Sequence, residues 1–109
     1  MLNQEFKKNL KESFEGSRIV RENTKISIDM YADTVVTIDD FEELTKDGEK
    51  FYAVTTVGNP GKYFFSGKAL TDIINACVEA GEDIRGEKIY IGVKTKTKSG
   101  RTFTPVILM

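Results

Sequence analysis

The chain has 109 residues, with 16 Lys and Arg, 17 Asp and Glu and no His, which leaves a formal net charge of −1. This length fits one domain, and 39% hydrophobic with 30% charged residues argues against both a disordered chain and a membrane protein. The near-zero net charge argues against a uniformly basic coat for nucleic acid.

The cysteine and histidine counts narrow the chemistry. Cys77 is the single cysteine, so we expect no disulfide framework and predict a cytoplasmic location. Without His, neither a His-based catalytic triad nor a common zinc site can be assembled. We therefore expect a protein that is not an enzyme and needs no cofactor. No apolar run approaches the ~20 residues of a membrane span, so no membrane contact is expected.

Residues 1–24 are predicted to form an N-terminal arm, helical or flexible, ahead of a folded domain over residues 25–109. Four-residue spacing of apolar side chains supports a short amphipathic helix formed by Leu2, Phe6, Leu10 and Phe14. Such a helix either docks on the domain or contacts a partner or a second copy of the chain.

The domain begins with strand signals. Ile26, Ile28 and Met30 alternate with polar residues, as in a half-buried strand. Asp47-Gly48 is a strong hairpin-turn signal. The predicted strands cover residues 26–30 with 34–41, then 50–57, and then 62–66 after a turn at 58–61.

A helix is predicted after the third strand. Ser66 is its candidate N-cap, and Gly81 stands where a terminating glycine is expected. Its apolar stripe consists of Leu70, Ile73, Ile74, Cys77 and Val78. Two further strands are predicted at 88–98 and 102–108. Because Pro105 has no N–H to donate, the last strand should lie at an edge or be bulged there.

The predicted order of strand, strand, strand, helix, strand, strand is that of the five-stranded oligonucleotide/oligosaccharide-binding barrel, the OB-fold. An aromatic third strand runs directly into the helix in the segment GKYFFSGKALTDIINA, residues 61–76. On this order and segment, residues 25–109 resemble an OB-fold single-stranded DNA-binding protein of the type carried by bacteriophages and mobile elements. The resemblance implies a mainly β fold, single-stranded DNA as the partner, and the cytoplasm of a bacterial host as the location.

Basic residues cluster late in the chain. Strand alternation places Lys88, Tyr90, Lys94, Lys96 and Lys98 on one face, and Arg101 follows the turn. Lysines at alternate positions repeat every ~6.6–7 Å, which suits the phosphates of an extended single strand. Gly92 on the same face would leave room for a base or sugar. Lysines on an outer strand also prevent aggregation, and that reading stays open.

Aromatic residues supply a second signal on the second and third strands, whose outer face is the usual OB-fold binding surface. We expect Phe64 to point inward, and Tyr63 and Phe65 to point outward beside Tyr52 and Lys62. Outward rings would stack on bases, at ~1–3 kcal/mol each. The alternative places Phe65 beneath the helix.

Residues 29–49 hold eight carboxylates, Asp29, Asp33, Asp39, Asp40, Glu42, Glu43, Asp47 and Glu49, against Lys46. They fit no calcium-loop spacing, so we interpret them as a solvated acidic surface that repels nucleic acid. The net charge of −1 therefore hides a polarised molecule.

The leading hypothesis is sequence-tolerant binding of single-stranded DNA, protecting it in phage or mobile-element replication or recombination. A single barrel covers only about 4–16 nucleotides, so we expect a homo-oligomer, with replication or recombination proteins as further partners. The alternative hypothesis is a small phage-type interaction module that binds a host protein through the acidic stretch or the arm.

Overall fold

The computed structural model describes residues 16–109, which form a mainly β fold around a six-stranded sheet. The predicted helix over residues 2–14 lies outside the described residues. The elements, in chain order, are α2 (Arg18–Glu22), β1 (Thr24–Lys25), the 3-10 helix η1 (Ile28–Tyr31), β2 (Thr34–Lys46), β3 (Glu49–Thr56), β4 (Lys62–Phe65), α3 (Gly67–Glu79), β5 (Lys88–Ile91), β6 (Thr95–Lys96), β7 (Thr102–Phe103) and β8 (Val106–Leu108).

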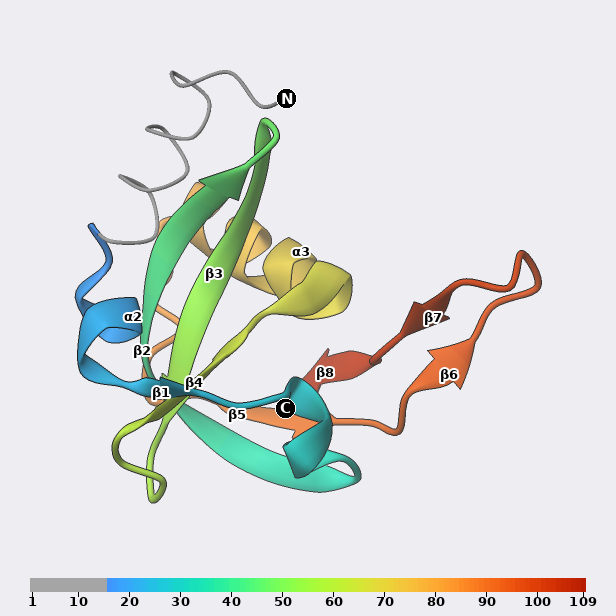
Figure 1. The fold of residues 1–109 in the computed structure, drawn as a ribbon, viewed down its shortest axis with the longest axis horizontal. Helices are drawn as coiled ribbons and strands as arrows, with labels where there is room; N and C mark the ends of the chain where they lie inside the picture. Colours follow the sequence, from blue (N-terminus) through green and yellow to red (C-terminus); the bar gives the residue numbers. More distant parts are fainter. Residues whose placement is uncertain (1–15) are drawn as a thin grey trace, which may run out of the picture.

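The six strands of the sheet lie in the order β1-β4-β3-β2-β5-β8, and its outer strands β1 and β8 do not pair with each other (Figure 1). Neighbours are antiparallel except β1, which runs parallel to β4. β2 pairs with β5 through Thr34–Thr37 and with β3 through Ile38–Lys46. A register shift between Ile38 and Asp40 lies next to the point where β2 changes partner, and a bulge of this kind bends a strand. One curved strand therefore carries both halves of the sheet.

The hairpin turn predicted at Asp47-Gly48 is confirmed, and it connects β2 to β3. Asp47 and Gly48 have φ values of 52° and 78°, the pair of positive values that a two-residue hairpin turn with the right-handed strand twist requires. The register continues to Lys46 opposite Glu49 on either side of the turn. Local turn chemistry therefore determines where β3 begins.

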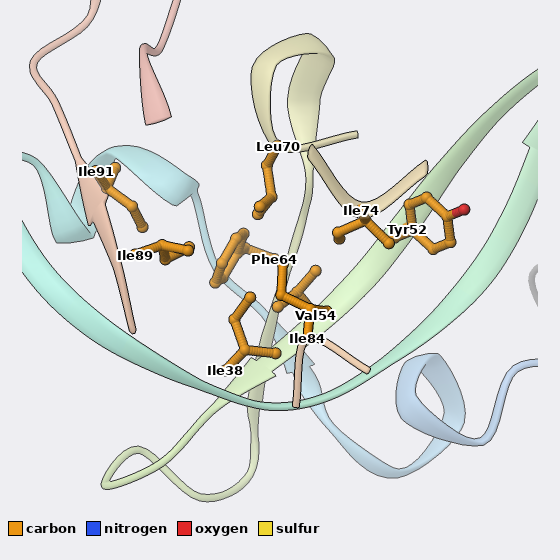
Figure 2. Packing of buried hydrophobic residues seen from close by; sticks show 9 residues of the cluster. All are labelled: Ile38, Tyr52, Val54, Phe64, Leu70, Ile74, Ile84, Ile89 and Ile91. Atoms are coloured by element: carbon orange, nitrogen blue, oxygen red, sulfur yellow. The ribbon is translucent and has the colours of Figure 1, made fainter. Parts of the chain in front are cut away.

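The concave side of the sheet and α3 enclose the main core (Figure 2). Its buried members are Ile38, Tyr52, Val54, Phe64, Leu70, Ile74, Ile84, Ile89 and Ile91. Leu70 and Ile74 come from the predicted stripe of the helix, and Ile73 and Cys77 pack at the margin. Val78, the last predicted member of the stripe, is 53% exposed and does not belong to the core.

Ser66 stands directly before α3, but its side chain does not cap the helix. Its hydroxyl accepts the Tyr52 backbone N–H at 3.0 Å and bonds the Thr71 hydroxyl. The serine therefore links β3 to the first turn of α3. Gly81 follows the C-cap Ala80 with φ 74°, as expected for a helix-terminating glycine.

The opposite face of β3 and β4 carries a second apolar cluster. Ile19 of α2 is 1% exposed and packs with Leu44, Ala53 and Tyr63, and Phe51 and Phe65 border them. Part of the segment assigned to the arm, α2 with β1, is therefore packed on the sheet and covers the outer face of β3 and β4.

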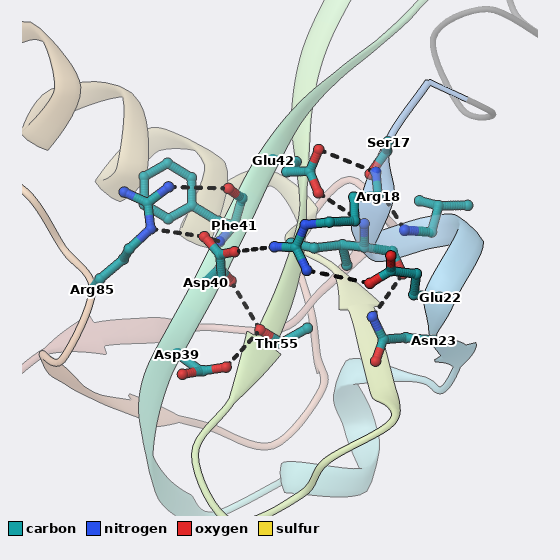
Figure 3. A network of polar contacts seen from close by, with 12 residues as sticks. Ser17, Arg18, Glu22, Asn23, Asp39, Asp40, Phe41, Glu42, Thr55 and Arg85 are labelled. Atoms are coloured by element: carbon teal, nitrogen blue, oxygen red, sulfur yellow. Dashed lines mark hydrogen bonds and ion pairs between the residues drawn. The ribbon is translucent and has the colours of Figure 1, made fainter.

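Polar contacts from β2 hold α2 in this position (Figure 3). The Glu42 carboxylate accepts the backbone N–H groups of Arg18 at 3.3 Å and Ile19 at 2.8 Å, which have no acceptor within the helix. Arg18 Nη2 also donates to Asp40 Oδ2 at 2.7 Å, and Arg85 Nε donates to Asp40 Oδ1 at 2.7 Å. Asp40 thus connects α2 to the loop after α3.

Three predicted strands differ from those observed. Residues 26–30 do not form a strand, because Ser27 accepts the Asp29 N–H and starts η1. The strand predicted over 88–98 ends at Ile91 and resumes only as the short β6. The strand predicted over 102–108 is divided at Pro105 into β7 and the edge strand β8, in line with the expected effect of proline.

Candidate nucleic-acid interface

Residues 94–103, here called the basic hairpin, extend away from the sheet (Figure 1). β6 and β7 pair antiparallel with Thr95 opposite Phe103 and Lys96 opposite Thr102. The turn is closed by the Thr97 N–H, which donates to the Arg101 carbonyl at 2.7 Å, with Gly100 at φ 84°. The hairpin is a separate two-stranded unit, so its side chains are set by this register and not by the main sheet.

The register divides the basic residues between the two faces of the hairpin. Directly opposed residues share a face, and side chains alternate along each strand. Lys96 therefore lies on one face with Thr102, whereas Lys94 precedes β6 and Lys98 lies in the turn. Arg101 and Phe103 lie on the other face with Thr95. All residues from 94 to 103 are exposed, and none of them is acidic.

The charges of the hairpin are largely uncompensated. Lys94 Nζ lies 3.7 Å from Asp29 Oδ2, and within residues 16–109 no carboxylate pairs with Lys96, Lys98 or Arg101. Four positive charges thus project together into solvent. Such a surface attracts polyanions through long-range electrostatics and releases counterions from them on binding.

The foot of the hairpin is fixed to the domain. The Gly92 N–H donates to the Pro105 carbonyl at 2.8 Å, and the Thr104 hydroxyl donates to Asp29 Oδ1 at 2.9 Å. Gly92 is buried, and a Cβ built on it would lie 2.7 Å from Pro105 Cγ. The prediction that Gly92 leaves room for a base or sugar is therefore wrong, because that room is filled by proline.

Two predicted base-stacking rings are buried. Tyr63 is 6% exposed in the outer cluster, and Tyr52 is 3% exposed in the main core. The Tyr52 hydroxyl donates to Asn75 Oδ1, and burial raises the pKa of both tyrosines, with Glu43 and Glu79 adding to the effect at Tyr52. The prediction that Tyr63 faces solvent is wrong because α2 covers its face. Neither ring offers a surface to a base.

Phe65 and Lys62 lie on β4, outside the basic hairpin. Phe65 is half-buried, and its ring meets Phe51 and Tyr63 edge to face with centroids 5.3 and 5.7 Å away. Lys25 Nζ lies 4.5 Å from the Phe65 centroid. Lys62 is half-buried opposite Thr24 in the parallel pair. Both residues belong to the packing of β1 on β4.

Lys88 and Tyr90 lie on β5 and are separated from the hairpin lysines by the end of that strand at Ile91. The continuous row predicted from Lys88 to Lys98 is therefore not formed. The Tyr90 hydroxyl donates to Asp33 Oδ1, and this hydrogen bond raises the pKa of Tyr90, with burial and the charge of Asp33 acting in the same direction. Of the ten predicted site residues, the structure groups Lys94, Lys96, Lys98 and Arg101.

Phe103 was not among the predicted site residues. It is 40% exposed, whereas every other aromatic residue of residues 16–109 is buried or half-buried. The available signal was its position next to the Ser99-Gly100 turn, where a short hairpin strand exposes both faces. Phe103 was instead expected within one long final strand over residues 102–108.

The acidic stretch was predicted to be a solvated surface, but only part of it is. Asp40 and Glu42 are half-buried and bind Arg18, Arg85 and the start of α2, whereas Asp39 and Glu43 are exposed. Burial acts to raise the pKa of Asp40, but the hydrogen bonds from Arg85 and the Phe41 N–H and the charges of Arg85 and Arg18 outweigh it, and the pKa is lowered. Within the described part of the chain, no group of three His, Cys, Asp or Glu residues is placed to hold a metal ion.

No protein family, no curated protein and no solved structure matches this chain. Among residues 16–109, no helix has the length and apolarity to cross a bilayer.

Proposed function

We propose that this protein binds single-stranded DNA, without reading its sequence, through the basic hairpin. The observation that carries the proposal is the projection of Lys94, Lys96, Lys98 and Arg101 from the domain on one hairpin without an acidic residue. Lys96, Lys98 and Arg101 have no ion-pair partner within residues 16–109, so little has to be broken before they meet phosphates.

We further propose that the fold is a partly open OB-type barrel, with the support of the strand order. Without β1, the sheet reads β4-β3-β2-β5-β8, with α3 between the third and fourth of these strands in the chain. OB-folds can be partly open and bind oligonucleotides with the loop between their last two strands. The basic hairpin occupies that place, between β5 and β8.

The usual OB-fold surface on the second and third strands is covered here by α2. That cover favours the hairpin as the main contact. The hairpin lysines would neutralise phosphates, and Arg101 would hold a phosphate from the face opposite Lys96 through its planar, multi-donor guanidinium. A small site of this kind gives useful affinity for long DNA only when several copies bind together, so the proposal includes self-association and a protective role in phage or mobile-element replication or recombination.

A direct test is a titration of fluorescein-labelled oligo-dT with the protein, followed by anisotropy. With three or four phosphate contacts, raising the salt from about 50 to about 200 mM should weaken binding roughly 20- to 50-fold. Absence of binding at the lower salt concentration would refute the proposal.

A second candidate function, binding of a protein partner, is favoured by one specific observation. Val35, Tyr90 and Ile107 stand side by side across β2, β5 and β8 on the outer face of the sheet. Val35 is 47% and Ile107 60% exposed, so an apolar row faces solvent. If Ile107→Lys abolished co-purification of a defined host protein while DNA binding was absent, this second function would be preferred.

A further inference from the structure

A cavity of about 340 Å³ lies at the foot of the basic hairpin, between η1, the start of α3 and β7. Its lining includes Phe103, Lys68, Lys94, Asp29 and Thr104. The volume is at the lower end of the ~300–1,000 Å³ range of small-molecule sites and suits one nucleotide better than a larger ligand.

Phe103 is the one aromatic residue among those that line the cavity. The other aromatic side chains of residues 16–109 are buried or half-buried, whereas Phe103 is 40% exposed. Covering an exposed aromatic ring lowers the free energy of a complex, and nucleobases stack well on aromatic faces. The ring lies on the strand that follows Arg101, so a base against Phe103 would be continuous with a backbone held by the hairpin.

Two cationic residues, Lys68 and Lys94, line the same cavity as Phe103. Lys68 is highly exposed, and its Nζ lies 3.2 Å from Asp72 one helical turn along α3. Lys94 Nζ lies 3.7 Å from Asp29. Exposed pairs of this kind are weak, so both ammonium groups can turn to a phosphate at small cost.

The Asp29 carboxylate in the cavity does not cancel the positive charge of Lys68 and Lys94. Asp29 Oδ1 accepts the Thr104 hydroxyl at 2.9 Å, and Asp29 Oδ2 faces Lys94. Its negative charge is therefore partly offset by a hydrogen bond and a neighbouring cation. With Lys68 and Lys94 against Asp29, the residues that line the cavity retain positive character.

Building on the proposed function, we infer that this cavity receives one unstacked nucleotide, with the base against Phe103 and its phosphate at Lys68 or Lys94. The lysines of the hairpin bind any polyanion, but only an unpaired base can leave its stack and enter the cavity. The cavity is thus the source of selectivity for single strands over duplexes.

The test compares the affinity of the full chain for three labelled ligands of equal length: oligo-dT, an abasic oligonucleotide with the same phosphates, and a DNA duplex. One base stack is worth about 5- to 150-fold in affinity, so oligo-dT should bind more tightly than the abasic strand by that factor. Phe103→Leu should remove this preference, whereas Phe103→Tyr, which keeps a ring, should retain it.

If Phe103→Leu binds the abasic strand as tightly as the unsubstituted protein does, the hairpin of the variant is still folded and still binds phosphates. Equal affinity of the unsubstituted protein for oligo-dT and the abasic strand, or an undiminished preference in Phe103→Leu, would overturn the inference and leave hairpin binding intact. No binding of any ligand at low salt would instead overturn the proposed function, and the inference with it.

Discussion

The hydroxyl of Thr104 donates a 2.9 Å hydrogen bond to Asp29 across 75 residues of sequence, and this contact joins the foot of the basic hairpin to η1. Thr104→Val keeps the side-chain shape and removes the donor. We expect the free energy of unfolding, measured by urea titration, to fall by about 0.5–1.5 kcal/mol.

Thr102→Val is the matched control, because Thr102 lies two residues earlier, is exposed, and its hydroxyl makes no hydrogen bond within residues 16–109. Equal stabilities of the two variants would show that the Thr104 contact does not anchor the hairpin.

Asp40 should make stability dependent on acid pH. Burial acts to raise its folded pKa, but the hydrogen bonds from Arg85 and the Phe41 N–H and the charges of Arg85 and Arg18 outweigh it, so the pKa is lowered. The contribution is complete above the usual Asp pKa of about 3.9 and is lost as the pH falls through the lower folded value. Urea titrations at several pH values should show that Asp40→Asn flattens this decline.

Asp39→Asn removes an exposed carboxylate from the same strand and is the control for that series. A decline below pH ~4 that is the same in both variants would show that Asp40 is not its source.

Tyr63 should act as a core residue. Since it is 6% exposed under α2, Tyr63→Ala should lower the free energy of unfolding by about 3–5 kcal/mol, the range for loss of a large buried aromatic. Tyr63→Phe should retain most of the stability, because the ring is kept. If Tyr63→Ala instead had normal thermal stability and weakened DNA binding, the ring would be a binding platform after all.

Gly92 should not tolerate a side chain. The Cβ of Gly92→Ala would lie 2.7 Å from Pro105 Cγ and 3.3 Å from its carbonyl oxygen, and overpacking of this kind typically costs about 1–3 kcal/mol. The double variant Gly92→Ala with Pro105→Ala should recover part of the loss in urea titrations. Strictly additive effects of the two substitutions would mean that the two residues do not compete for space.

Short-range signals allowed much of the fold to be predicted. The apolar spacing from Leu70 to Cys77 and the Asp47-Gly48 turn are local patterns, so the helix and the first hairpin could be placed without knowing the rest of the chain. The end of β5 at Ile91 was missed, because alternation of lysines continues through Lys98 although the pairing partner changes.

The exposure of the aromatic residues could not be predicted, for a physical reason. Alternation indicates which residues share a face of a strand, but not whether another element covers that face. Tyr63 is covered by Ile19, which is distant in sequence and lies in a helix of 5 residues too short to give a periodic signal. The basic residues were easier to identify, because charge rarely becomes buried.

The central claim is that the basic hairpin binds single-stranded DNA, and the most direct measurement is the oligo-dT affinity of a variant with Lys96→Gln, Lys98→Gln and Arg101→Gln. Loss of three phosphate contacts should weaken binding on the order of 100-fold at about 0.1 M salt and lower the salt slope by roughly 2. A control with Lys46→Gln, Lys50→Gln and Lys88→Gln removes the same charge from exposed positions elsewhere and should bind nearly as the unsubstituted protein does. Equal losses in the two variants, or none in the hairpin variant, would contradict the claim.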